Sequence, residues 1–189
     1  MANKDNLGFR PAVPNPDKVR RFPVTAAGNP TYNLFVGDAV KPESTGGVCP
    51  LDAGATGNDL ALGVIVAVYD SNGVPCGAPG SSISTKYLTL GVAGYVDVHI
   101  ATPGEQFIGQ SQTGTAYVVS DIFAGVNIVA GTGDTTTARS GHELGATGGV
   151  DAVILGLVNE PGNAWGANVD VYFSFLSSYW GQIPPAAGV

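Results

Sequence analysis

The segment from Val150 to Phe175 constrains the fold of this chain more than any other part of the sequence. Between residues 168 and 175, apolar and polar residues alternate strictly. Successive side chains of a β-strand point to opposite faces, so this period predicts a strand with one buried and one solvated face. The residues expected on the buried face are Val169, Val171, Phe173 and Phe175.

The first half of the same segment predicts a second strand. Residues 152–158 are almost continuously apolar and rich in β-branched residues, which is typical of a strand covered on both faces. Residues 159–163, Asn-Glu-Pro-Gly-Asn, have turn chemistry, because Pro fixes φ and Gly tolerates a positive φ. We therefore expect two core strands joined by a loop that displays Trp165.

Further strands are expected at short spacing along the rest of the chain. The longest covers residues 86–100, with Gly91 and Gly94 marking a bulge or bend. Another covers residues 60–70 and ends in an Asn72-Gly73 turn. No helix is convincing, so the pattern predicts an all-β fold, either a compact β-barrel or a β-sandwich. The remaining expected strands are residues 21–26, 31–36, 106–108, 116–119 and 126–129.

The length of 189 residues suits a single domain of this class. Residues 1–20 contain three prolines and no sustained period, and we interpret them as an extended N-terminal arm. The β domain is expected to cover residues 21–180, followed by a C-terminal tail at 181–189. Deletion of residues 1–20 is accordingly expected to leave a folded protein.

The distribution of charge favours docking on a partner over binding of nucleic acid. Six of the eight basic residues and three of the fifteen acidic residues lie in the first 41 positions, which gives that segment a net charge of +3. The rest of the chain carries two basic and twelve acidic residues, a net charge of −10. Nucleic-acid binding usually needs a basic patch on the folded domain. A basic arm on an acidic body instead indicates a segment that docks on a complementary surface, or else a solvated tail.

The cysteines and the lengths of the apolar runs indicate in which cellular compartment the protein is made and whether it enters a membrane. Cys49 and Cys76 have no C-x-x-C spacing, and no signal peptide is evident near the first residue, so we expect reduced thiols in a protein made in cytoplasm. A disulfide between them remains an alternative. The apolar runs fall short of the roughly 20 residues that a membrane helix needs, and no membrane association is expected.

No motif predicts catalysis or metal binding. Asp97 and His99 project from the same face of one expected strand, but no framed nucleophile accompanies them, so a solvated polar pair is the expectation. His142 and Glu143 lack a further ligand at zinc spacing, and a structural or surface role is expected. Residues 131–133, Gly-Thr-Gly, are not followed by a phosphate-loop lysine, and residues 70–73 lack the downstream acid of a calcium loop. We expect no enzyme activity and no cofactor.

Aromatic residues near the C-terminal end form a second set of candidates. They suit a platform for stacking on sugars, and equally core packing or a subunit interface. These residues are Trp165, Tyr172, Tyr179 and Trp180.

Four segments resemble the capsid decoration (cement) proteins of tailed bacteriophages. They are MANKDNLGFRP at the start, RRFPVTAAGNPTYNLFVGDAVK, ALGVIVAVYD, and ILGLVNEPGNAWGANVDVYFSF near the end, and they occur in the family's order. Between residues 70 and 149 little of the chain matches. The resemblance implies a small β-barrel or sandwich, often a trimer, that sits outside an icosahedral shell and clamps capsid subunits without a cofactor.

The resemblance implies a major capsid protein as the partner and the outer capsid surface of a virion as the location. A homo-oligomer is expected, a trimer before a dimer. Docking needs apolar anchors and cationic groups, so the basic segment is expected to lie across the shell and bridge neighbours. The expected capsid-contact residues are Phe9, Arg10, Lys18, Arg20 and Arg21.

Three other functions stay open at this point. A receptor- or glycan-binding fibre module would use Trp165, Tyr172 or Trp180 as a stacking surface. A hydrolase on a β scaffold would need Asp97, His99 and a serine or acid to converge in a cleft. A component of the tail tube or the head–tail connector would also suit a basic arm and low charge.

Overall fold

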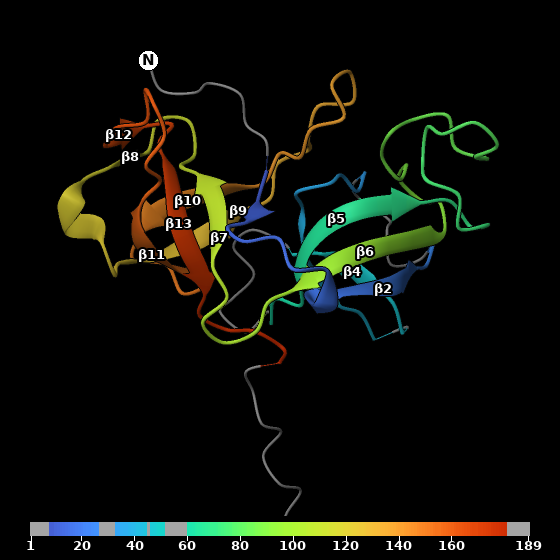
Figure 1. Ribbon diagram of the computed structural model, residues 1–189, viewed down its shortest axis with the longest axis horizontal. Helices are drawn as coiled ribbons and strands as arrows, with labels where there is room; N and C mark the ends of the chain where they lie inside the picture. Colours follow the sequence, from blue (N-terminus) through green and yellow to red (C-terminus); the bar gives the residue numbers. More distant parts are fainter. Residues whose placement is uncertain (1–7, 27–32, 45, 52–59, 181–189) are drawn as a thin grey trace, which may run out of the picture.

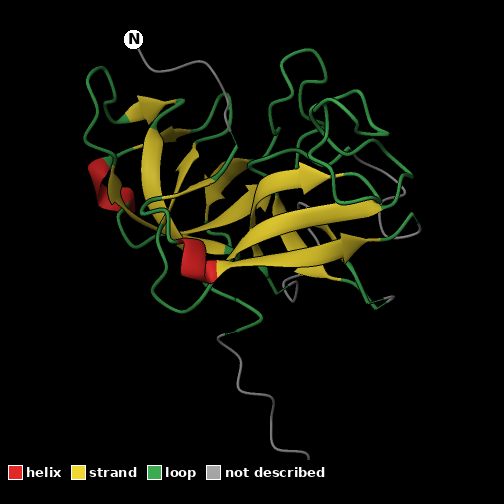
Figure 2. Cartoon of the chain, turned by 45° about the vertical axis from the view of Figure 1, so that its right-hand side comes forward, coloured by secondary structure: helices red, strands yellow, loops and turns green. Residues whose placement is uncertain are grey.

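The computed structural model describes residues 8–26, 33–44, 46–51 and 60–180, and the regular secondary structure in this part of the chain is almost entirely β-strand. Two curled antiparallel sheets, one of six strands and one of five, lie side by side, and their strands run in crossing directions (Figures 1 and 2). The prediction of an all-β fold is confirmed. No helix in the described part has the length and apolar character to cross a membrane.

The six-stranded sheet contains the first and the last strand of the described chain. Its order is β1-β7-β13-β11-β9-β10, and all neighbouring strands are antiparallel. A parallel bridge between Ser111 and Leu144 brings β10 back beside the end of β7, so the sheet curls toward a barrel. The strands are β1 (Arg10–Pro11), β7 (Phe107–Gln110), β13 (Asp170–Phe175), β11 (Ala152–Leu157), β9 (Gly125–Val129) and β10 (Glu143–Thr147).

The five-stranded sheet has the order β2-β6-β5-β3-β4. A two-stranded ribbon and two 3-10 turns complete the fold. The strands are β2 (Val19–Val24), β6 (Gly94–Ile100), β5 (Gly63–Tyr69), β3 (Ala39–Pro42) and β4 (Val48–Pro50), the ribbon is β12 (Gly166–Ala167) with β8 (Ala116–Tyr117), and the turns are η1 (Pro16–Lys18) and η2 (Val119–Asp121).

Strand β13 follows its predicted pattern, while β11 departs from it. Val171 and Phe173 are fully buried with Val169 just before them, and the opposite side of β13 carries Tyr172. On β11 only one face is buried, because Val153 points outward and stays half-exposed. The expectation that this strand is covered on both faces is wrong. Its continuous apolar run instead leaves apolar side chains at the surface.

Each sheet has its own hydrophobic core, and the two sheets share a seam. The first core fills the six-stranded sheet around Phe107, Phe173 and Ile154. The second lies inside the five-stranded sheet around Ile65, Val96 and Val98. Residues of the five-stranded side also enter the first core, so apolar contacts run from one sheet into the other. These seam residues are Ala39, Leu51, Ala61, Val64 and Ala101.

The predicted strand at residues 86–100 is shorter in the structure. Strand β6 begins at Gly94, and a turn closed by the bond from Val92 N to Thr89 O precedes it. Gly91 lies in this turn with a φ of 70°, in the left-handed region that favours glycine. Leu90 and Val92 are therefore exposed instead of lying in the core. Of the strand expected at residues 31–36, the described part from residue 33 contributes only an isolated bridge between Leu34 and Leu88.

The N-terminal segment is built into both sheets from residue 8 onward. Phe9 is 2% exposed in the first core, β1 pairs with β7, and β2 pairs with β6 from Val19. The expected division at residue 20 therefore falls inside β2. Phe9 is a core residue in the described chain, which leaves almost none of its surface for the expected contact with a partner. The first seven residues of the expected arm and the expected tail at 181–189 lie outside the described residues.

Candidate binding site

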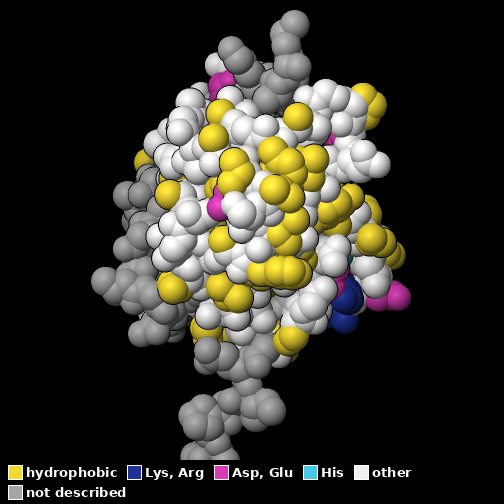
Figure 3. Space-filling view, turned by 90° about the vertical axis from the view of Figure 1, so that its left-hand side faces the viewer, with side chains coloured by type: hydrophobic (Ala, Val, Ile, Leu, Met, Phe, Trp, Pro, Cys, Tyr) yellow, Lys and Arg dark blue, Asp and Glu magenta, His cyan; other side chains and the backbone are white. Residues whose placement is uncertain are grey.

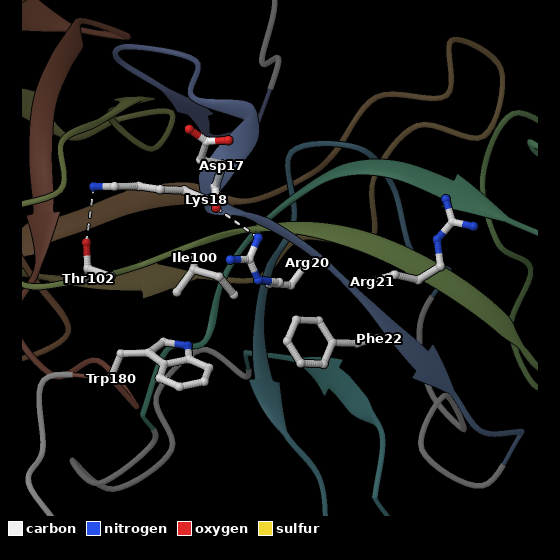
Figure 4. Close-up of a pocket in the computed structure, with 8 residues that line it drawn as sticks. All are labelled: Asp17, Lys18, Arg20, Arg21, Phe22, Ile100, Thr102 and Trp180. Atoms are coloured by element: carbon white, nitrogen blue, oxygen red, sulfur yellow. Dashed lines mark hydrogen bonds between the residues drawn. The ribbon is translucent and has the colours of Figure 1, made fainter.

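A pocket of about 450 Å³ lies at the open end of the five-stranded sheet, where three separate segments of the chain meet. Residues from η1 and β2 form one side, the end of β6 forms the floor, and the segment after β13 closes the other side (Figure 4). The lining residues are Asp17, Lys18, Arg20, Arg21, Phe22, Ile100, Thr102 and Trp180.

The register of β2 decides which of its side chains enter the pocket. Arg20 pairs with Val98 and Phe22 with Val96, and both valines belong to the second core. Paired residues of adjacent strands share a face, so Arg20 and Phe22 lie on the concave side of the sheet. Arg21 pairs with Asp97 and points away from the other pocket side chains (Figure 4).

The side chain of Arg21 belongs to a cluster on the convex face. Its guanidinium donates to both carboxylate oxygens of Asp97, at 2.8 and 3.1 Å, and stacks 3.9 Å from the ring centre of Tyr69. The Tyr69 hydroxyl donates to the same carboxylate at 2.7 Å. The bonds from Arg21 hold the pKa of Asp97 below its usual range, against the opposing effect of burial. This guanidinium is therefore committed within the fold.

Lys18 is also neutralised inside the molecule. Its ammonium contacts the Glu105 carboxylate and lies 3.3 Å from the Thr102 hydroxyl. His99 Nε2 lies 3.2 Å from the other oxygen of Glu105. Burial alone would raise the pKa of Glu105, but the hydrogen bonds from Lys18 and His99 outweigh it, and the pKa lies below its usual value.

Arg20 differs from these two cations because no carboxylate of the described chain pairs with it. Its Nη1 donates to two backbone carbonyl oxygens, those of Asp17 and Val19, each at 2.8 Å. A guanidinium has five N–H groups, and Nη1 supplies two of them. The edge formed by Nε and Nη2 makes no hydrogen bond to the described residues. That edge is the fork that binds carboxylates in bidentate fashion.

The apolar wall opposite Arg20 comes from the chain after β13. Ala61 N donates to Ser177 O at 3.0 Å and Tyr179 N to Ala61 O at 2.9 Å, which fixes this segment against the five-stranded side. Trp180 follows, 52% exposed, with its ring edge-on to Tyr179 at 5.6 Å. In Figure 4 the indole lies beneath Ile100 and Arg20, on the side of the pocket opposite η1. The pocket therefore combines an apolar wall with one unneutralised guanidinium.

The structure brings together only part of the predicted contact set. Lys18, Arg20 and Trp180 line the pocket with their side chains, whereas Arg10 pairs with Glu160 at 3.2 Å on the six-stranded sheet. Trp165 is half-buried against the first core, so its loop does not display it freely.

Sequence reasoning assigned no role to Phe22 or Ile100. The side chains of the expected strand at VRRFPV alternate between its two faces, which places Phe22 on the same face as Arg20. This period could have indicated Phe22 as a neighbour of Arg20.

The two histidines are both buried, which contradicts the solvated face expected for His99 and agrees with a structural role for His142. His99 is 1% exposed and edge-on to Phe107, so it is not on a solvated face, and Asp97 has the partners described above. His142 is 2% exposed because β10 begins at the next residue and places it at the seam. Its Nδ1 accepts from Ala39 N at 3.2 Å, and its Nε2 lies 3.7 Å from Asp38 Oδ1. Both side chains therefore bind groups within the fold.

Asp70 organises the loop that the sequence identified as a turn. Its carboxylate accepts hydrogen bonds from Asn72 N, Val74 N and Ser82 N and from two serine hydroxyls. These donors, Ser82 first, lower the pKa of Asp70 to about 2. Among the described residues no three His, Cys, Asp or Glu side chains gather as a set of metal ligands. Cys49 and Cys76 form no disulfide.

A second surface, the apolar face, covers the outer side of the six-stranded sheet and the η2 segment. Hydrophobic side chains are spread across this side of the molecule with few charged groups among them (Figure 3). Phe123, 77% exposed, is held beside β11 by the bond from its N to Ile154 O. Leu176 N donates to Asp151 O, directly before β11. We use the term apolar face for the exposed residues Val118, Val119, Phe123, Val150 and Leu176 together with the partly exposed Val153.

A comparison of the chain with protein-family models, with curated proteins and with solved structures finds no match in any of the three.

Proposed function

We propose that this protein is a structural component of a tailed-phage virion that binds the outside of the icosahedral capsid and bridges major capsid protein subunits. The observation that supports the proposal is that two surfaces on different sheets have a composition suited to binding a partner. One is the apolar face on the six-stranded sheet, and the other is the pocket at the end of the five-stranded sheet. A bridging protein needs at least two such surfaces, because each must engage a different neighbour.

The chemistry of the two surfaces suits attachment. Exposed apolar side chains gathered on one side of a protein favour association at that side. Aromatic and arginine side chains contribute most to binding energy at such sites, and Trp180 with Arg20 supplies both kinds in one pocket. Many modest contacts repeated over a closed shell hold it by avidity, with no need for a high affinity at each site.

We propose further that copies of the chain form a trimer in which the apolar face of each copy packs against the next copy, so that the trimer presents three pockets to different capsid subunits. In a closed ring every copy makes the same contact with its neighbour. Sedimentation equilibrium of the purified chain tests this directly. We expect a trimer for the wild type and a monomer for Phe123→Asp; a wild-type monomer at all concentrations would contradict the proposed oligomer.

Cryo-microscopy of the particle tests the main proposal. Expanded capsids of the phage that encodes this chain should show its density on the outer shell, over the junctions between capsid subunits. Purified chain added to undecorated capsids should co-sediment with them and raise their resistance to heat. Density confined to the tail or the connector, with a bare shell, would overturn the proposal.

One observation favours a second candidate, a glycan-binding module. Tyr179 and Trp180 are both about half exposed and lie edge to face, which provides ring surface for stacking on a sugar. Binding on a glycan array that Trp180→Ala abolishes, with capsid binding absent, would support this function instead.

A further inference from the structure

We propose that the pocket at the end of the five-stranded sheet binds a peptide segment in which an Asp or Glu carboxylate is flanked by aliphatic side chains. The carboxylate would bind to Arg20, and an aliphatic neighbour would pack on Phe22, Ile100 and Trp180. This inference rests on the proposed function in one respect: the segment would be presented by the capsid subunit.

The hydrogen bonds of Arg20 determine the class of ligand. Both N–H groups of Nη1 are directed at backbone carbonyl oxygens of the same turn, so the guanidinium plane is fixed before any ligand arrives. The Nε and Nη2 edge then presents two parallel donors in the geometry of a carboxylate. A side chain that is already ordered loses little conformational entropy on binding, which favours affinity.

The charge balance of the pocket argues for one negative charge. Glu105 neutralises Lys18 and Asp97 neutralises Arg21, so Arg20 supplies the only uncompensated positive charge among the described lining residues. The Asp17 carboxylate also lines the pocket, and in Figure 4 it lies above η1, turned away from Trp180. A dianionic phosphate would meet one cation and a nearby carboxylate, whereas a single carboxylate is matched by Arg20 alone.

The size and lining of the pocket select what flanks the carboxylate. A volume of about 450 Å³ accommodates a few side chains, within the range of roughly 300–1,000 Å³ for ligand pockets. Phe22 and Ile100 are anchored by the second core, so the floor is rigid and apolar. An aliphatic side chain next to the acid removes this surface and the Trp180 ring from water.

Two short peptides provide the direct test. The acidic probe is acetyl-Ile-Glu-Ile-amide, and its neutral match is acetyl-Ile-Gln-Ile-amide. Titration is followed by NMR through the Trp180 indole N–H signal, assigned by its loss in Trp180→Phe. We expect the acidic peptide to bind with a Kd about 10- to 100-fold lower, as expected for charge-assisted bonds in a partly enclosed site. Equal Kd values would overturn the inference.

Three variants assign the effect to the pocket. In Arg20→Gln the preference for the acidic peptide should vanish, and in Arg20→Glu it should reverse toward acetyl-Ile-Lys-Ile-amide. Lys86→Gln is the matched control, because Lys86 is an exposed cation outside the pocket lining. Arg20 is exposed, so these variants should keep the wild-type melting temperature.

A preference for the acidic peptide that is retained in Arg20→Gln, or lost in Lys86→Gln, contradicts the assignment to Arg20. Tighter binding of a phosphoserine peptide would overturn the carboxylate class.

Co-sedimentation with capsids separates the inference from the proposed function. If wild-type protein binds no capsid, the proposed function fails, and the peptide titrations still decide what the pocket binds. If wild-type protein binds and Arg20→Gln binds equally well, the proposed function stands and the pocket is not the capsid contact. We expect wild type and Lys86→Gln to bind and Arg20→Gln to lose at least tenfold in affinity.

Discussion

At the scale of single residues, Asp70 shows how one carboxylate can hold a long loop together. It is buried, and its oxygens accept bonds from residues 72–82, all of which lie outside β-strands. The loop from residue 71 to residue 93 covers the second core, to which Ile83 and Leu88 belong. Loss of the Asp70 acceptors would release this cover, because a loop without strand bonds depends on side-chain acceptors.

Protonation of Asp70 should therefore lower the stability of the protein in acid. Its pKa is lowered from 3.8 to about 2 in the folded state, so its contribution is complete above pH 3.8 and is lost as the pH falls toward 2. We expect Asp70→Asn to have a lower urea midpoint than wild type at pH 6. That difference should shrink between pH 4 and pH 2. Parallel pH profiles of the two proteins over this range would contradict the role of the carboxylate charge.

At the scale of elements, strand β5 leaves no room for a side chain at Gly63. A Cβ atom there would lie 2.1 Å from the backbone oxygen of His99 on the paired strand β6. The contact is with backbone, so only a shift of one strand could relieve it. We expect Gly63→Ala to lower the free energy of unfolding by about 1–3 kcal/mol or more, measured by urea denaturation.

Gly156 provides the matched control for this substitution. It lies in strand β11, and a Cβ atom built there meets nothing within 4 Å. Gly156→Ala should be neutral or slightly stabilising, by up to about 1 kcal/mol, because alanine reduces the entropy of the unfolded chain. Equal losses in the two variants would show that the backbone contact at Gly63 is not the cause.

The N-terminal segment should stabilise the fold through one side chain. Phe9 packs against Phe173, with ring centres 4.9 Å apart, and edge-on to His142 at 6.0 Å. Phe9→Ala should cost about 3–5 kcal/mol of unfolding free energy, because it leaves a cavity in a closed core. Exposed Val13→Ala, four residues further on, is the control and should change little. A Phe9→Ala variant as stable as wild type would restore the segment as a detachable arm.

Elements whose signal is local could be predicted from the sequence, and those that depend on distant partners could not. Strand β13 was evident because its alternation needs only one buried face. The turn at Gly91 was hidden because apolar residues continue through it without being buried. His99 was expected on a solvated face because Phe107, which covers it, belongs to another strand, and the partner of His142 at Ala39 is equally distant in the chain. Lys18, Arg20 and Trp180 could be named as contacts, but their meeting with Phe22 and Ile100 depends on three separate segments.

At the scale of the whole molecule, the shared seam should make the two sheets unfold together. Val64 and Ala39 of the five-stranded sheet are fully buried in the first core, so unfolding either sheet exposes apolar surface of both. Each sheet also has its own tryptophan reporter, Trp165 against the first core and Trp180 beside Ile100.

Single-tryptophan variants make this measurable. Trp165→Phe retains Trp180 as the only tryptophan, and Trp180→Phe retains Trp165, so excitation at 295 nm reports on one side chain in each variant. We expect the two fluorescence transitions in urea to share one midpoint and to coincide with circular dichroism, after correction for any stability change of each variant. Separate midpoints for fluorescence and circular dichroism within one variant would show that the sheets unfold independently.

The strand order of the six-stranded sheet has a consequence for how the chain is made. Strand β7 has the first described strand, β1, on one side and the last, β13, on the other. Until β13 leaves the ribosome, β1-β7 and β11-β9-β10 have no backbone link across the middle of the sheet. The six-stranded sheet therefore becomes continuous only after β13, the last described strand, has been synthesised. Chains terminated before β13 would lack the strand that joins the two parts.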